Sequence, residues 1–201
     1  MNSTAAQELL TDLKDGVLTL TLNRPDVLNA LTMGMMHGIK DALKSAATDK
    51  AIKAVILTAS GRAFCAGADL GDLKKRQAVK TFSLGDELRN HFNPLIAQIR
   101  QLEKPVLGAI NGLAAGAGAS IILATDLKVC ADKATFLNAF VRVGLVPDSG
   151  MTYSLPRFAG YSKALEHMWL AKPVTAEQAL ACGLVNKVVP AEFVLAEAQV
   201  M

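Results

Sequence analysis

Apolar and polar residues alternate along residues 16–24, GVLTLTLNR, and Pro25 follows directly. This pattern predicts a half-buried β-strand that ends before the proline. Residues 32–49 repeat their apolar positions at helical spacing, which predicts an α-helix after that strand. Two β-branched, apolar runs, 52–60 and 105–110, each predict a strand that is buried on both faces.

The rest of the chain continues this alternation. A polar stretch and then a helix around residues 84–103 separate the two buried strands. Thr175 suits the N-cap of a later helix, and Gly183 lies near the end of that helix. Strands and helices in alternation predict an α/β fold with crossover connections. Further short strands are expected at 127–132, 134–138 and 183–190, and further helices at 162–171 and 175–183.

The composition is that of a soluble globular protein. The 201 residues are 51% hydrophobic and 19% charged, which favours one domain with a sizeable core. No apolar run is long enough to span a bilayer, and residues 1–16 lack the basic and apolar segments of a secretory signal. We therefore expect a cytoplasmic protein that does not bind membranes.

Charge and cysteine content argue against two further classes of protein. The net charge is only +3, with both signs interspersed, which is too weak a bias to indicate nucleic-acid binding. Cys65, Cys130 and Cys182 show neither the pairing of a disulfide framework nor the spacing of a zinc site. We expect all three to be buried thiols that behave as small apolar side chains.

Two loops rich in glycine and alanine each follow a predicted buried strand: 61–70, GRAFCAGADL, and 111–120, NGLAAGAGAS. Gly116 and Gly118 resemble part of a dinucleotide-binding turn, but Ile121 stands where that fingerprint needs its third glycine. No Walker A lysine follows either loop. In an α/β sheet, ligands collect at the carboxyl ends of strands, where helix N-termini present free amides.

Two such loops side by side could offer two N–H groups to one oxygen atom, which is the composition of an oxyanion hole. Small side chains would let a carbonyl oxygen come within hydrogen-bonding distance of the backbone. The alternative interpretation is that small residues only permit tight packing between strand and helix. The loop compositions by themselves leave both interpretations open.

Five segments, in this order, resemble the enoyl-CoA hydratase/isomerase, or crotonase, superfamily: NRPDVLNAL, GRAFCAGADL, KPVLGAINGLAAGAGAS, DLKVCADKATF and GLVPDSGMTYSLPR. The resemblance runs from about residue 10 to the C-terminus. It implies an α/β, crotonase-like spiral of repeated ββα units, which we assign to residues 1–190 as a core that binds CoA thioesters. Residues 191–201 would begin a C-terminal helical region, shortened here, of the kind that mediates formation of a homotrimer or hexamer.

The same resemblance implies an acyl-CoA thioester as the ligand and assigns residues to it. The amides of Ala68 and Ala117 would hold the thioester oxygen. The backbone around Ala66, Ala68 and Leu70 would border the adenine end of CoA, and Arg24 falls near a basic residue that the family often places by the CoA phosphates. Coenzyme A is part of the substrate, so no separate cofactor and no metal are expected.

The acid or base that faces the hole decides the reaction within the superfamily. Hydratases that resemble this chain carry glutamates at the positions of Ser120 and Phe140, so an ordinary hydratase is disfavoured. Asp148 stands where double-bond isomerases and the ring-opening isomerase of phenylacetate breakdown carry Asp or Glu. One carboxylate suffices to move a proton along an acyl chain, and we expect Asp148 to be this base. The alternative is that Asp148 caps a helix starting at Ser149.

The other ionisable candidates receive supporting or structural roles. Asp69 is expected to bond to loop backbone, and Asp126 to anchor a turn after a helix. His91 lies on the helix that tends to wall the acyl pocket and is a candidate supporting residue. His37 and His167 are expected at the surface or its boundary, and no histidine pair has metal-ligand spacing.

Three other functions remain as alternatives to an isomerase. One is an enoyl-CoA hydratase. A dehalogenase-type enzyme would also use an aspartate at position 148, but with a histidine where Asn93 stands. A protein of a different class, a non-catalytic acyl-CoA-binding protein, would retain CoA without exchanging the α-protons of the acyl group.

Overall fold

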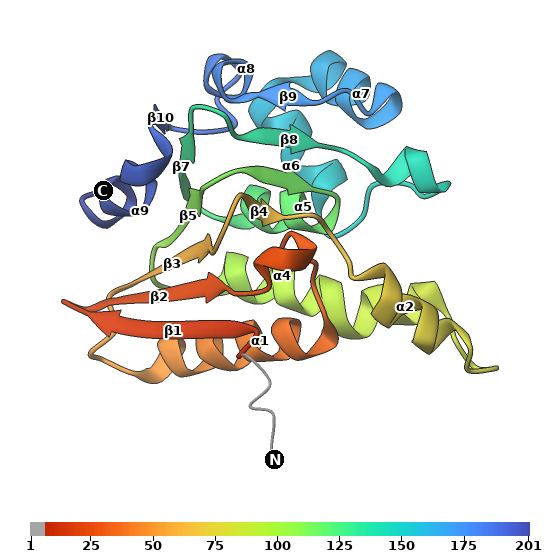
Figure 1. Cartoon of the computed structure of the whole chain (residues 1–201), viewed down its shortest axis with the longest axis horizontal. Coiled ribbons are helices and arrows are strands. Elements are labelled where there is room, and N and C mark those ends of the chain that lie inside the picture. The colour runs from red at the N-terminus through yellow and green to blue at the C-terminus, as the bar shows by residue number, and fades with distance from the viewer. Residues whose placement is uncertain (1–6) are drawn as a thin grey trace.

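The computed structural model describes residues 7–201, which form two β-sheets and the helices that cover them (Figure 1). Neighbouring strands are parallel except in the pairs β1–β2 and β8–β9. The larger sheet has the order β1 (Leu9–Lys14), β2 (Val17–Leu22), β3 (Ala54–Ala59), β5 (Val106–Ile110), β7 (Leu127–Ala131) and β10 (Lys187–Val189). The smaller sheet has the order β4 (Ala63–Cys65), β6 (Leu113–Ala115), β8 (Thr135–Leu137) and β9 (Val174–Thr175).

The chain repeats a unit of two strands and a helix. The first strand of each unit joins the larger sheet and the second joins the smaller one, as in β3–β4, β5–β6 and β7–β8. Figure 1 shows β3, β5 and β7 on the left, with β4 and β8 displaced to the right. This arrangement confirms the predicted α/β fold of repeated ββα units.

Helices begin where the sequence supplies caps. The Thr32 side chain accepts a hydrogen bond from the Met35 amide, and Thr175 forms a capping box with Gln178, as predicted for that helix.

Between residues 7 and 201, no helix is both long and apolar enough to cross a membrane. The α-helices are α1 (Met33–Thr48), α2 (Leu70–Gln77), α3 (Leu84–Glu87), α4 (Asn93–Gln101), α5 (Ala117–Ala124), α6 (Met151–Ala159), α7 (Tyr161–Leu170), α8 (Ala176–Ala181) and α9 (Val194–Gln199).

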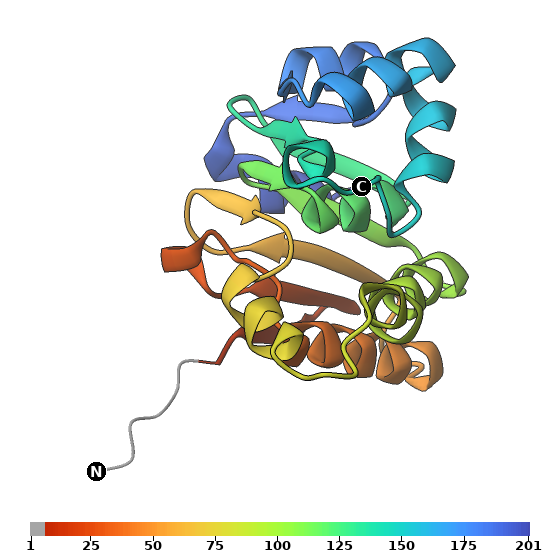
Figure 2. The same cartoon turned by 90° about the vertical axis from the view of Figure 1, so that its right-hand side faces the viewer.

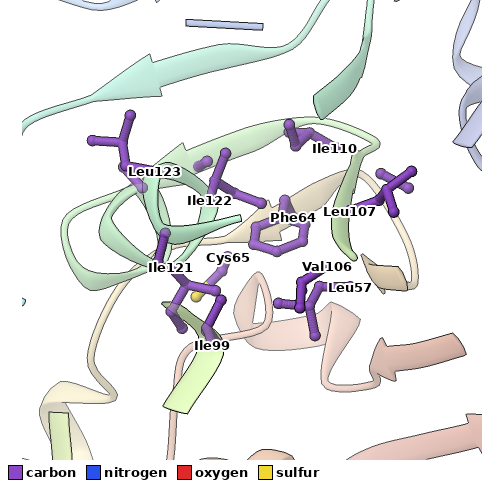
Figure 3. Packing of buried hydrophobic residues seen from close by; sticks show 14 of the residues in the cluster. Leu57, Phe64, Cys65, Ile99, Val106, Leu107, Ile110, Ile121, Ile122 and Leu123 are labelled. Carbon is purple, nitrogen blue, oxygen red and sulfur yellow. The ribbon is translucent and has the colours of Figure 1, made fainter. Parts of the chain in front are cut away.

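The core lies between the two sheets and around α5. All residues of α5 are buried, so its N-terminus is held by packing on every side. Phe64 of β4 is 1% exposed, and Figure 3 shows its ring among Leu107 and Ile110 of β5 and Ile122 of α5. Because interiors are close-packed, small shifts of β4 or α5 would be resisted on both sides.

A buried cation holds the other end of α5. Lys128 is 1% exposed, its Nζ donates to the Thr125 carbonyl oxygen over 2.9 Å, and it lies 4.4 Å from the centroid of the Phe158 ring. A positive charge at a helix C-terminus is favourable because of the helix dipole. Burial lowers the pKa of Lys128 to about 8. The lysine thus fixes the helix whose N-terminus carries the second glycine-alanine loop.

Several predictions of local structure need correction. The strand β1 was not predicted because five of its six residues are exposed and show no apolar alternation. The strands β4 and β6 lie inside the stretches predicted as loops, and α2 lies inside the predicted polar stretch. The strand expected over 183–190 forms only at Lys187–Val189. Cys65 and Cys130 are buried as predicted, whereas Cys182 is half-buried.

The contact between β4 and α5 generates a prediction about stability. A Cβ added at Gly118 would lie 2.5 Å from the carbonyl oxygen of Cys65, a backbone atom that cannot rotate away. We expect Gly118→Ala to lower the free energy of unfolding by about 1–3 kcal/mol or more, as overpacking does. Denaturant unfolding measures it. Gly34→Ala is the matched control: Gly34 is an exposed residue of α1, and a Cβ added there would meet only the ends of the Glu8 and Thr32 side chains, so the variant should not be destabilised. Equal stability of the two variants would contradict the packing.

Candidate active site

The two glycine-alanine loops meet at one cavity of about 450 Å³. Ala66 and Ala68 of the first loop and Gly116 and Ala117 of the second loop line this cavity. A Cβ added at Gly67 would lie 3.7 Å from the backbone nitrogen of Ala117, so the two backbones approach closely. The structure therefore brings together the two loops that the sequence places 50 residues apart.

The orientation of the first loop is set by its neighbour, Leu31. The Leu31 N–H donates to the Gly67 carbonyl oxygen over 2.8 Å, and the Asp69 N–H donates to the Leu31 carbonyl oxygen over 2.9 Å. The Gly67 C=O and the Ala68 N–H belong to one planar trans peptide and point in opposite directions. The Ala68 N–H therefore points away from Leu31, and residues 7–201 supply no acceptor for it.

The second loop ends at the N-terminus of α5. Gly116 has φ +49°, a left-handed conformation that glycine adopts without strain. Its carbonyl oxygen accepts the hydrogen bond of the Ser120 N–H over 3.0 Å and so begins the helix. Ala117 is the first helical residue, and amides of a first turn have no partner within the helix. Two free N–H groups at one cavity can stabilise a developing oxyanion.

Arg24 lies behind the first loop. Its Nη1 donates to the Asp69 Oδ2 and to the Ala30 carbonyl oxygen, each over 2.7 Å, and its Nε lies 3.1 Å from Glu8 Oε1. Asn29, fully buried, accepts from the Arg24 N–H and donates to two carbonyl oxygens of the 60–63 turn. The NRPDVLNAL segment thus clamps the loop that carries Ala68.

Asp69 and Asp126 have structural partners. The Asp69 side chain caps α2 by accepting from the Asp72 amide, and this bond together with Arg24 holds its pKa below the usual value. The Asp126 carboxylate accepts from the Val106 N–H over 2.9 Å and pairs with Arg100, so it anchors the start of β5. Both carboxylates are committed to the scaffold.

Comparison with known proteins gives the family. Residues 12–201 match the family model described as enoyl-CoA hydratase/isomerase. The chain is 42% identical over 179 residues to a Rhodobacter capsulatus protein named "Probable enoyl-CoA hydratase", covering 89% of this chain and 67% of that protein. It is 40% identical to the 1,2-epoxyphenylacetyl-CoA isomerase of Escherichia coli, covering 95% of this chain and 73% of that one.

A solved structure supports the same family. The crystal structure of an enoyl-CoA hydratase from Mycobacterium avium subsp. paratuberculosis superposes with a TM-score of 0.86 at 36% identity, covering 99% of this chain and 77% of that one. The chain belongs to the enoyl-CoA hydratase/isomerase family. It is therefore an enzyme of the crotonase superfamily, and the relatives above carry both hydratase and isomerase names.

Ser120 and Phe140 both lie at the site. Ser120 holds the backbone of Asp148, and Phe140 forms part of the cavity wall. The Ser120 hydroxyl is buried and donates to the backbone oxygen of Asp148 over 3.3 Å. Phe140, 7% exposed, lines the cavity. Neither side chain can transfer a proton as a carboxylate does.

Asp148 lines the same cavity as Ala68 and Ala117 and is half-buried. Its carboxylate accepts from the Ser149 hydroxyl over 2.8 Å. Burial raises the pKa of Asp148, and the Ser149 hydrogen bond partly opposes that rise. The alternative of a helix-capping aspartate is wrong, because α6 starts after Gly150 with no side-chain cap and uses only the backbone oxygen of Asp148.

The remaining walls of the cavity are apolar and come from segments far apart in the sequence. In the view of Figure 2, α2 in yellow and the 3-10 helix η3 (Phe140–Val143) in blue-green both face the viewer. Leu70, predicted to border CoA, lies on this wall and is 69% exposed. Leu88 and Phe92, the first and last residues of the π-helix η2 (Leu88–Phe92), line the cavity, as expected for the helix that carries His91, although its π-helical form was not predicted. The apolar wall residues are Val27, Ala30, Leu70, Leu73, Leu84, Leu88, Phe92, Ala139, Phe140, Val143 and Leu145.

The histidines and Asn93 lie away from the cavity wall. His91 packs against the exposed His37 of α1, with ring centroids 5.8 Å apart, and burial lowers its pKa. Asn93 is exposed on α4. His167 lines a separate cavity of about 20 Å³. The part of the chain from residue 7 onward holds no cluster of three or more potential metal ligands, and a metal-free site stays a prediction.

The Ser149 contact generates a prediction about titration. Removing the hydroxyl that stabilises the charged carboxylate should raise the pKa of Asp148 further, so the group would ionise at higher pH. Ser149→Gly suits the test because Ser149 has φ +51°, where glycine is unstrained. ¹³C NMR titration of the labelled Asp148 carboxyl measures the shift. Ser120→Ala is the control, because the Ser120 hydroxyl bonds to the backbone oxygens of Asp148 and Gly116 and not to the Asp148 carboxyl group; a shift in the control alone would contradict the assignment.

Proposed function

We propose that this enzyme moves a double bond along the acyl chain of an enoyl-CoA thioester, with Asp148 as the base. The Asp148 carboxylate removes a proton from the α-carbon of a β,γ-enoyl thioester, and the electron pair passes into the carbonyl group. The resulting enolate oxygen accepts hydrogen bonds from the N–H groups of Ala68 and Ala117. Asp148 then returns the proton to the γ-carbon, which leaves the double bond at the α,β position with no net change in atoms.

One observation carries the proposal: Asp148 is the uncommitted carboxylate at the cavity. Of the two aspartates among the described lining residues, Asp69 is held by Arg24 and a helix amide, whereas Asp148 accepts one hydroxyl. A base is stronger when desolvation raises its pKa, which is the direction found for Asp148. A single base is what an isomerisation needs.

The alternatives lack a comparable support in the cavity. A hydratase needs one group to activate water and another to protonate carbon, and Ser120 and Phe140 supply neither carboxylate. A dehalogenase-type reaction has no histidine at Asn93, which is exposed. A non-catalytic acyl-CoA-binding protein would have no need for a base next to the oxyanion hole.

The CoA moiety and self-association belong to the same proposal. The backbone of Ala66, Ala68 and Leu70 would border the adenine, and all three residues line the cavity. Assembly into a homotrimer or hexamer fits the large apolar side chains exposed on α6 and α7, including Tyr153 at 61% and Trp169 at 68%.

Asp148→Asn tests the proposed base. The variant keeps the size of the side chain and cannot accept a proton, so exchange of α-protons should fall at least a hundredfold, as loss of a general base does. Deuterium incorporation into but-3-enoyl-CoA in heavy water, compared at equal occupancy, measures the effect. Stability should not fall, because the Asp148 side chain caps no helix.

The matched control for this experiment is Asp12→Asn, which removes the same charge from exposed β1. Equal exchange rates in Asp148→Asn and Asp12→Asn would exclude Asp148 as the base. Retention of CoA with neither isomerisation nor exchange by the unaltered enzyme would favour the acyl-CoA-binding alternative, and addition of water would favour a hydratase.

Ala117→Val tests the oxyanion hole. The added methyl groups do not remove the N–H donor, but they obstruct the approach of the thioester oxygen. We expect turnover to fall on the order of a hundredfold, comparable to the loss of one hole donor. Ala117→Gly keeps the amide without bulk and should retain most of the activity. Circular dichroism checks that both fold, and a fully active valine variant would place the thioester elsewhere.

A further inference from the structure

We propose that Arg24 is a positioning residue for the oxyanion hole, acting on the Ala68 N–H through a relay of two peptide groups. The proposal rests on the proposed function, because it concerns the donor that would hold the thioester oxygen. It differs from the role implied by the family resemblance, in which a basic residue near this position lies beside the CoA phosphates.

The first link joins the guanidinium to the peptide between Ala30 and Leu31. Arg24 Nη1 donates to the Ala30 carbonyl oxygen over 2.7 Å. The Ala30 C=O and the Leu31 N–H are parts of one planar trans peptide group and point in opposite directions. The cation therefore lies at the acceptor end of a peptide whose donor end points at the first glycine-alanine loop.

The second link joins that peptide to the hole. The Leu31 N–H donates to the Gly67 carbonyl oxygen over 2.8 Å, and the Gly67 C=O shares its peptide group with the Ala68 N–H. In order, the relay consists of the guanidinium, the Ala30–Leu31 peptide, the Gly67–Ala68 peptide and the thioester oxygen. The Leu31 N–H has the Gly67 carbonyl oxygen as its acceptor, and Arg24 Nη1 also donates to Asp69 Oδ2, next to Ala68. Arg24 therefore constrains the orientation of the Ala68 N–H both through the relay and through Asp69.

The relay also polarises the final donor. Hydrogen bonds in a chain strengthen one another by roughly 10–30% per bond, and a charged donor makes the strongest first link. A guanidinium stays charged at every accessible pH, so the relay does not titrate. The enolate carries more negative charge on oxygen than the bound thioester does, so a stronger donor stabilises the transition state more than the ground state.

The surroundings of Arg24 favour this role over attraction of phosphates. Its side chain is 22% exposed and is paired with the carboxylates of both Glu8 and Asp69. Two negative charges offset the field that an approaching phosphate would feel, while the hydrogen bond to Ala30 remains. The effect of Arg24 on a ligand is therefore short-ranged and passes along the hydrogen bonds.

Infrared spectroscopy of a bound thioester tests the relay without turnover. Butanoyl-CoA labelled with ¹³C at the thioester carbonyl should show a lower carbonyl stretching frequency when bound than when free. Arg24→Met should reduce this shift, and Arg24→Lys should restore part of it, because a lysine is a charged donor. Arg157→Met is the control: Arg157 also donates to a carbonyl oxygen over 2.7 Å, at Tyr153 on exposed α6.

Kinetics with two thioesters separates the relay from a phosphate contact. We compare but-3-enoyl-CoA with the N-acetylcysteamine thioester of the same acid, which has no phosphates and no adenosine. The relay predicts that Arg24→Met lowers kcat by about tenfold with both substrates, less than the loss of a whole hole donor. A phosphate contact predicts a higher KM for the CoA thioester alone and no effect with the short thioester.

The outcomes distinguish a role of Arg24 at the oxyanion hole from a phosphate contact and from failure of the hole itself. If the carbonyl shift is equal in the unaltered enzyme and in Arg24→Met, and circular dichroism shows that both are folded, the relay is overturned. The proposed function is then left intact. The phosphate pattern in the kinetics also overturns it. Bound butanoyl-CoA with no carbonyl shift even in the unaltered enzyme would instead refute the oxyanion hole itself. If Arg24→Met fails to fold, the comparison of Arg24→Lys with the unaltered enzyme decides in the same way.

Discussion

Close approach between backbones is the constraint on which the site depends. A Cβ added at residue 118 would lie 2.5 Å from the carbonyl oxygen of Cys65, and a Cβ at residue 67 would lie 3.2 Å from the carbonyl oxygen of Ala115. Only small residues permit strands β4 and β6 and helix α5 to meet so closely. The same closeness would let two amides reach one ligand oxygen, so the packing interpretation and the proposed oxyanion hole are compatible.

Burial and hydrogen bonds hold the two loops in this geometry. All of α5 is buried, and the first loop is hydrogen-bonded along the 28–31 segment through Leu28, Leu31 and Asp69. Donors that are fixed before the substrate arrives need no reorganisation when charge develops, and this preorganisation is the main source of electrostatic catalysis. The cavity wall that would face the acyl chain is formed elsewhere, in part by the π-helix η2 and by leucine side chains.

The sequence pointed to the strand-and-loop pairs of the site but could not show its distant contacts. Two strands followed by small residues were compatible with an oxyanion hole, and the family resemblance implied both the hole and Asp148 as its base; both stay predictions. No pattern could show that Ser120 would bond to the Asp148 backbone or that Arg24 would reach Asp69, 45 residues away. The strands β4 and β6 escaped prediction because three residues are too few to display a period.

The surroundings shift the pKa values of two carboxylates at one cavity in opposite directions. This difference supports a separate role for each. Asp69 receives a guanidinium and a helix amide, so its pKa is lowered and it stays charged as part of the scaffold. Asp148 is half-buried with one hydroxyl donor, so its pKa is raised and its carboxylate is a stronger base. Because residue 148 also lies beside the hole, proton transfer and charge stabilisation can act on the same acyl group. A carboxylate with the partners of Asp69 could not take that role at either position.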